Sequence, residues 1–123
     1  KNFFTLVKEE QKETFFEKYT KFRPVFDQIS ENISKMDFFL VYGSYARLAA
    51  EKDSDLDILI VGKIKNKEMI RETLVSLDME VSIKIETYKD FKKRINEPLH
   101  QQILKDNILI YGVDRFINII SQL

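Results

Sequence analysis

The chain has 123 residues and a hydrophobic content of 44%, enough for one core of ordinary size but not for two domains. We therefore expect a single domain over residues 1–123. Twenty basic and twenty acidic residues cancel, so direct binding to nucleic acid or to an anionic membrane is not expected. The absence of cysteine excludes disulfides, zinc–thiolate sites and thiol nucleophiles, and it fits the reducing cytoplasm, where we place the protein. No apolar run reaches membrane-spanning length.

The N-terminal segment predicts a strand followed by a long helix. Residues 3–7, Phe-Phe-Thr-Leu-Val, read as a strand. Because this pattern begins almost at Lys1, the sequence is consistent with a domain cut from a longer protein. From Glu9 to about Ser34, apolar residues recur at intervals of three and four, which predicts an amphipathic helix. Pro24 is expected to kink or break that helix.

Two apolar, β-prone segments flank the most informative part of the sequence. Residues 38–42 predict a buried strand that runs directly into Gly43 and Ser44. Residues 56–61 predict a second buried strand. Between the two, residues 45–51 can form a short helix.

The remaining sequence alternates helices with strands. We expect helices near residues 66–76 and 88–95, a third helix opened by Asn96 and Pro98, a closing helix at the C-terminus, and strands over 79–87 and 108–111. The helical crossover between the second and third strands makes these two strands parallel. The predicted fold class is α/β or α+β, with a small mixed β-sheet covered by helices. His100 is expected to be exposed or half-buried on a helix, without a chemical role.

Two aspartates mark the start of the second strand. Side chains two residues apart in a strand point to the same face, so Asp55 and Asp57 present carboxylates about 7 Å apart. Paired oxygen ligands of this kind suit hard divalent cations, Mg²⁺ above all. Two like charges beside an apolar strand are unfavourable unless a cation neutralises them. The pair therefore predicts a metal site.

The turn after the first strand predicts a phosphate site. Gly43 allows the backbone to approach a ligand closely, and Ser44 offers a hydroxyl and an amide at the start of a helix, where anions are favoured. The turn and the two aspartates meet at one end of the sheet only if the two strands are antiparallel. In that case, a nucleoside triphosphate and Mg²⁺ could be held together, as nucleotidyl transfer requires.

This arrangement resembles the signature of the DNA polymerase beta-like nucleotidyltransferases, and in particular the minimal nucleotidyltransferase family. The signature is a hydrophobic strand, Gly-Ser, about ten residues, and Asp-x-Asp in another hydrophobic strand. The gap from Tyr45 to Ser54 is ten residues here. Arg47, three residues after Ser44, is also found in many small members of the family. The resemblance implies a palm-like fold and Mg²⁺-dependent transfer of a nucleoside monophosphate, with ATP as the expected donor, to a hydroxyl of a protein, nucleic acid or small molecule.

Two positions depart from the family pattern. Position 48 is leucine where many relatives have glycine. Active relatives also carry a third carboxylate on the next strand, and counting back from Thr87 places Lys84 at that position. A parallel crossover instead favours Glu80, which we predict to be the third carboxylate. If Lys84 occupied the position, the domain would bind nucleotide but transfer it poorly.

The resemblance therefore gives a set of expected roles and partners. The expected catalytic residues are Asp55, Asp57 and Glu80, with the metal on the two aspartates and the phosphates on Gly43, Ser44 and Arg47. Arg47 could equally pair with Glu51 on an exposed helix face. Small relatives often act as antitoxins that modify a helical toxin of the HEPN type, so a partner of that kind is expected, and the many phenylalanines suggest a homodimer. The alternative is a nucleotide-sensing or partner-binding domain of a transcriptional regulator, with an N-terminal DNA-binding domain.

Overall fold

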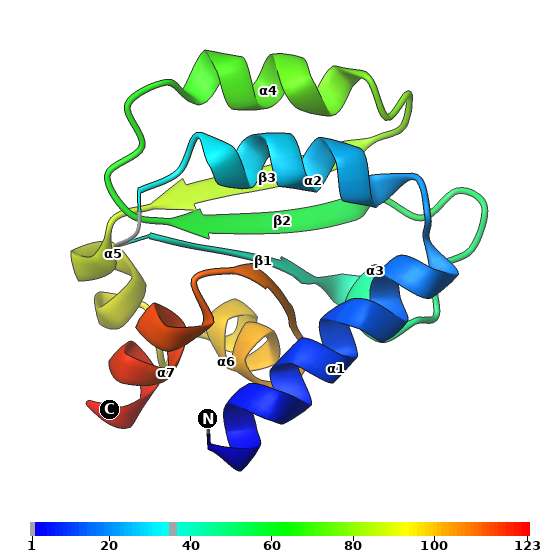
Figure 1. Ribbon diagram of the computed structural model, residues 1–123. Helices are drawn as coiled ribbons and strands as arrows, with labels where there is room; N and C mark the ends of the chain where they lie inside the picture. Colours follow the sequence, from blue (N-terminus) through cyan, green and yellow to red (C-terminus); the bar gives the residue numbers. More distant parts are fainter. Residues whose placement is uncertain (1, 35–36) are drawn as a thin grey trace.

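The sheet has four strands in the order β3-β2-β1-β4 and carries helices on both faces (Figure 1). The protein is represented by a computed structural model that describes residues 2–34 and 37–123. The elements are α1 Phe3–Lys18, α2 Phe22–Glu31, β1 Phe38–Tyr42, α3 Gly43–Ala46, β2 Leu56–Val61, α4 Lys67–Val75, β3 Val81–Glu86, α5 Tyr88–Lys93, α6 Pro98–Lys105, β4 Ile108–Tyr111 and α7 Val113–Ser121. The predicted class, a small mixed sheet covered by helices, is confirmed.

The N-terminal strand prediction is wrong, because residues 3–7 form the first turns of α1. Asn2 caps this helix, and its side-chain oxygen accepts a hydrogen bond from the Thr5 amide at 2.8 Å. The long predicted helix is broken, but at residues 19–21 rather than at Pro24. Pro24 lies in the first turn of α2, where its missing N–H leaves no helical hydrogen bond unmade.

The other elements were predicted with small shifts in their ends. The third strand begins at Val81 rather than at residue 79. Pro98 occupies the first turn of α6 as expected, but the cap residue is Glu97 rather than Asn96. None of the helices in the described ranges is both long enough and apolar enough to cross a membrane.

The strand pairing brings the two halves of the motif to one end of the sheet. β1 runs antiparallel to β2, with Tyr42 opposite Asp57, and antiparallel to β4. β2 runs parallel to β3, with Asp57 opposite Ser82, so the predicted parallel crossover is confirmed. The end of β1 and the beginnings of β2 and β3 therefore lie at the same end of the sheet.

Alternation along the strands divides the core into two clusters. One face of the sheet packs against α1, α2 and α4, where Phe22 and Phe26 stack with ring centroids 5.3 Å apart. The other face packs against α5, α6 and α7, where Phe38 contacts Phe116 with centroids 5.3 Å apart. Asp57 alternates with the apolar residues of the first cluster, so it lies on the second face.

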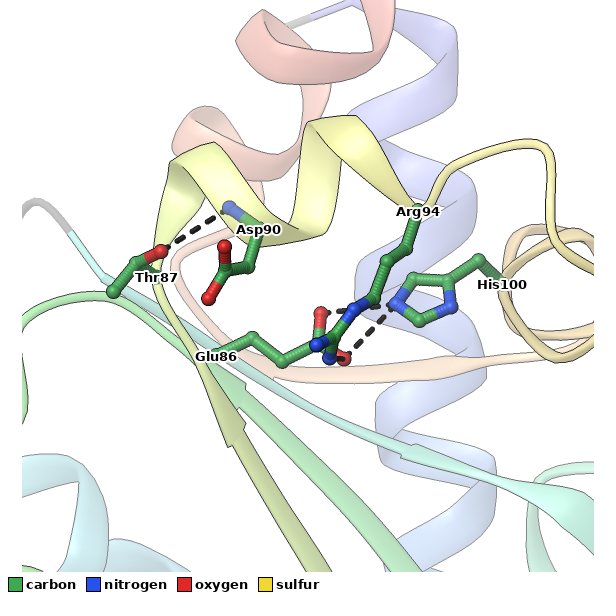
Figure 2. A network of polar contacts seen from close by, with 5 residues as sticks. All are labelled: Glu86, Thr87, Asp90, Arg94 and His100. Carbon is green, nitrogen blue, oxygen red and sulfur yellow. Dashed lines mark hydrogen bonds and ion pairs between the residues drawn. The ribbon is translucent and has the colours of Figure 1, made fainter.

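A buried acid–histidine pair closes the second face at the far end of β3 (Figure 2). His100 is 2% exposed, so its expected place on or near the surface is wrong. Its Nε2 lies 2.9 and 3.0 Å from the two carboxylate oxygens of Glu86, which is also buried. Arg94 donates to the same carboxylate at 3.4 Å from a more exposed position. This network ties the end of β3 to α5 and α6.

Glu86 and His100 should be energetically coupled in the free energy of unfolding. His100→Leu leaves the Glu86 carboxylate buried with only the longer Arg94 contact, and should lower the free energy of unfolding by about 3 kcal/mol. Replacing both residues with leucine should cost less than the sum of the single changes, because no uncompensated buried charge remains. Urea denaturation of the two single variants and the double variant measures this difference, and simple additivity would contradict the coupling.

Candidate active site

Gly43 and Asp57 are in direct contact because of the register between β1 and β2. Tyr42 is opposite Asp57, so the next residue, Gly43, turns across the Asp57 side chain. Gly43 has a φ of +72°, in the left-handed region. A Cβ at this position would collide with Oδ2 of Asp57 and lie 3.2 Å from its Cγ. Only glycine fits both the backbone conformation and the close approach.

The charge of Asp55 acts on the Asp57 carboxyl. Asp57 is half-buried and Asp55 is exposed. Burial raises the pKa of the Asp57 carboxyl, the charge of Asp55 raises it further, and the Arg47 guanidinium opposes both effects. A carboxylate that is destabilised by desolvation and by a second carboxylate is a suitable ligand for a hard divalent cation. The residues therefore fit the metal that the sequence predicts.

Ser44 lies in the first turn of α3, where backbone N–H groups have no acceptor within the helix. The helix is shorter than the predicted segment 45–51 and ends at Ala46. Leu48 explains this end, because its φ of +56° leaves the helical region. Lys18 on α1 holds the turn by donating to the Leu48 carbonyl at 2.7 Å.

The left-handed backbone at position 48 is one that favours glycine, so leucine here carries a conformational cost. Glycine adopts this conformation freely, whereas leucine does so at a cost of about 1 kcal/mol. The early end of α3 also separates Arg47 from Glu51, which are no longer one helical turn apart. The interaction with Asp57 is thus the electrostatic contact that the structure assigns to Arg47.

The register between β2 and β3 places the candidates for a third carboxylate relative to Asp57. The β3 residue directly opposite Asp57 is Ser82, which sequence reasoning did not single out. Glu80 lies one strand repeat earlier, and its carbonyl accepts from the Leu56 amide at 3.0 Å. Lys84 lies one repeat later, opposite Leu59. Across residues 2–34 and 37–123, no three acidic, histidine or cysteine side chains are grouped to hold a metal, so the role of Glu80 stays a prediction.

Tyr42 is a site residue that the sequence pattern concealed. It ends an apolar run and is 6% exposed, on the same face of the sheet as Asp57. Burial, followed by the charges of Asp57 and Glu86, raises the pKa of the Tyr42 phenol to about 12. The side chain is therefore a neutral hydrogen-bond donor beside the carboxylates at neutral pH.

Three comparisons relate the chain to known proteins. Residues 26–116 match the family model described as polymerase beta, nucleotidyltransferase. A protein of Methanocaldococcus jannaschii, whose name proposes it as a protein adenylyltransferase, is 31% identical over 75 residues, which cover 58% of this chain and 75% of that protein. A chain in the crystal structure of a toxin-antitoxin with AMP-PNP is 22% identical, with a TM-score of 0.48, and the match covers 75% of this chain and 77% of that one.

Gly43→Ala should destabilise the protein through two separable effects. The left-handed backbone costs about 1 kcal/mol for a residue with a Cβ, and the collision with Asp57 should add about 1–3 kcal/mol. In an Asp57→Ala background the second cost should disappear. Urea denaturation of the four proteins in this cycle measures the difference, and an equal cost in both backgrounds would argue against the contact.

Asp57→Asn should stabilise the metal-free protein at neutral pH. The native fold raises the pKa of the carboxyl above its ordinary value of 3.8, so it penalises the charged form. This penalty is complete above the raised pKa and disappears below the unfolded pKa. The gain should therefore be largest at about pH 7 and fade towards about pH 3 in urea denaturation curves. Asp53→Asn, at an exposed neighbouring position, is the matched control.

Proposed function

Because the chain belongs to the polymerase beta nucleotidyltransferase family, we propose that it transfers a nucleoside monophosphate from a nucleoside triphosphate to a hydroxyl group in a Mg²⁺-dependent reaction. The single observation that carries this proposal is the contact between Gly43 and Asp57. In support of the proposal, the turn that we propose to bind phosphate lies against a carboxylate whose charge is already disfavoured by burial and by Asp55. A phosphate chain and a metal could be held together there.

Each residue of the site has a distinct proposed role. Asp55 and Asp57 would hold Mg²⁺, which when bound supplies positive charge to the phosphates as negative charge develops on the leaving group. The Ser44 hydroxyl and the first-turn amides of α3 would orient the phosphates, and Gly43 leaves room for them. Arg47, whose charge reaches Asp57, would bind a phosphate oxygen. The protein acts mainly by positioning and by screening charge.

ATP and a protein hydroxyl are the proposed substrates. Support comes from the Methanocaldococcus jannaschii relative, whose name proposes adenylyl transfer to proteins. Around the Asp57 end of β3, Ser82 and Lys84 are exposed on the second face, so an acceptor could approach the sheet there. A HEPN-type helical toxin as that acceptor, and an antitoxin role in the cytoplasm, follow from the family resemblance and remain predictions. The same is true of a homodimer.

Ser82 favours a second candidate function. It stands opposite Asp57, where a third carboxylate would lie closest, so a domain that binds nucleotide but transfers it weakly is the alternative. Such a domain would serve as a nucleotide sensor or a partner-binding module of a transcriptional regulator. A strand at residues 3–7 would have supported the connection to an N-terminal DNA-binding domain. These residues are helical, so they do not support this alternative.

Mg²⁺-dependent nucleotide binding tests the proposal directly. Calorimetric titration with ATP, GTP, CTP and UTP, each with and without Mg²⁺, should show binding that requires the metal. Asp57→Asn should weaken this binding by at least about tenfold, because the charged ligand to the metal is lost. Asp53→Asn, an exposed acid outside the site, should leave it unchanged.

The outcomes separate the two functions. Metal-dependent binding followed by transfer of labelled AMP to a protein supports the enzyme. Metal-dependent binding without transfer to any protein in a cell extract supports the nucleotide sensor. Equal affinity in wild type and Asp57→Asn would remove the proposed site.

A further inference from the structure

A pocket lined by cationic side chains lies at the end of α3, next to the Gly43–Ser44 turn. Its volume is about 250 Å³, and it is bounded by α1, by the turn after α3 and by the connection from α6 to β4. The polar residues that line it include Lys8, Gln11, Arg47, Lys105, Asp106 and Asn107. Three cations and a single acid therefore surround it, although the whole chain has no net charge. Such a concentration of positive charge favours an anionic ligand.

Lys8 is the most unusual of these residues, because its charge is buried in α1. The residue is 8% exposed. Its Nζ donates to Oε1 of Gln11 at 3.1 Å and to the Asn107 carbonyl at 3.3 Å. Both acceptors are neutral, and burial lowers the pKa of the ammonium group. Within residues 2–34 and 37–123 no ion pair to this ammonium group is found, and a buried cation without a counter-charge is costly, so an anion in the pocket would lower that cost.

The neighbouring residues hold this lysine in place. Asn107 is itself buried, and its Nδ2 donates to the Ile103 carbonyl at 2.9 Å, which fixes the connection from α6 to β4. The Asn107 carbonyl is thereby fixed towards Lys8. Lys18 also donates to the carbonyl of Leu48, another residue that lines the pocket, at 2.7 Å. Buried residues therefore fix Lys8 and the connection before β4, whereas Arg47 and Lys105 are exposed at the pocket.

The pocket lies at the same end of the sheet as the proposed active site. Ile108, which opens β4, is opposite Val41, two residues before Gly43. The four residues of α3 span about 6 Å, from the phosphate turn at one end to Ala46 and Arg47 on the pocket wall at the other. A phosphate chain that starts at Gly43 and Asp57 and extends along α3 would reach these cations.

On the basis of the proposed function, we infer that this pocket holds the terminal phosphates of the nucleoside triphosphate, through Lys8, Arg47 and Lys105. The ligand class is a polyphosphate, the part of the substrate that leaves as pyrophosphate when the monophosphate is transferred. Lys8 lies outside residues 26–116, the part of the chain that matches the family model, so α1 adds this contact to the common site. The pocket would select triphosphates over monophosphates.

The test compares ligands that differ only in their phosphate chain. Full-length protein is titrated by calorimetry with ATP and with AMP in the presence of Mg²⁺, and with inorganic tripolyphosphate without metal. Lys105→Gln should weaken the binding of ATP and of tripolyphosphate about tenfold, the loss expected for one charge-assisted hydrogen bond, and leave AMP unchanged. Lys93→Gln, which removes an exposed charge on α5, is the matched control and should change none of the three.

Lys8→Met provides a second variant that keeps an apolar side chain in the buried position. It should weaken ATP and tripolyphosphate binding and leave AMP unchanged, and its thermal unfolding midpoint shows whether the fold persists. Unchanged ATP affinity in both variants, or equal losses for ATP and AMP, would overturn the inference. If tripolyphosphate binding depends on Lys105 but no nucleotide binds, the pocket stands as a polyphosphate site while the proposed function fails.

Discussion

The pairing of Tyr42 with Asp57 is the constraint on which the rest of the site depends. A shift of one residue in this register would turn Asp57 towards the aromatic cluster under α2 and α4, where an unpaired charge is costly. It would also move Gly43 away from the carboxylate. Packing of the core and assembly of the site therefore require the same register.

Aromatic residues at the end of α1 and in α2 pack against α3, which begins at the Gly43–Ser44 turn. Tyr45, in the middle of α3, is buried between Tyr19 and Phe22, with ring centroids 4.9 and 5.3 Å away. Phe22 in turn stacks on Phe15 of α1. The aromatic cluster thus holds α3 through contacts between rings. Lys18 of α1 donates to the turn after α3, and Lys8 lines the neighbouring pocket.

The sequence predicted the part of the site that depends on neighbouring residues in the chain. Strands 38–42 and 56–61 were recognisable because every position in them is apolar or belongs to the motif, and their antiparallel pairing followed from the need for Gly43 to meet Asp57. The start of the chain was misread for a local reason. Phe3, Phe4 and Leu6 are β-prone, yet the Asn2 cap starts a helix that leaves all three exposed.

Features that depend on distant parts of the chain could not be predicted. His100 stands alone on its helix, and its partner Glu86 belongs to a strand that reaches it only in the folded structure. The alternation in β3 predicted that Glu80, Ser82 and Lys84 share one face of the sheet. It did not predict their register against β2, so Ser82 was not singled out. The Lys8 pocket combines α1 with the connection between α6 and β4, a contact between residues 99 positions apart.

The burial of Tyr42 between two acidic groups has a practical consequence for spectroscopy. The chain contains no tryptophan, so its near-ultraviolet absorption and emission come from five tyrosines and ten phenylalanines. The Tyr42 phenol lies within electrostatic reach of Asp57 at one end of the sheet and of Glu86 at the other. A change of charge at either end therefore alters the environment of this chromophore. Tyrosine absorption would therefore respond to an ion bound at Asp57, so the proposed binding could be followed without a dye or an engineered tryptophan.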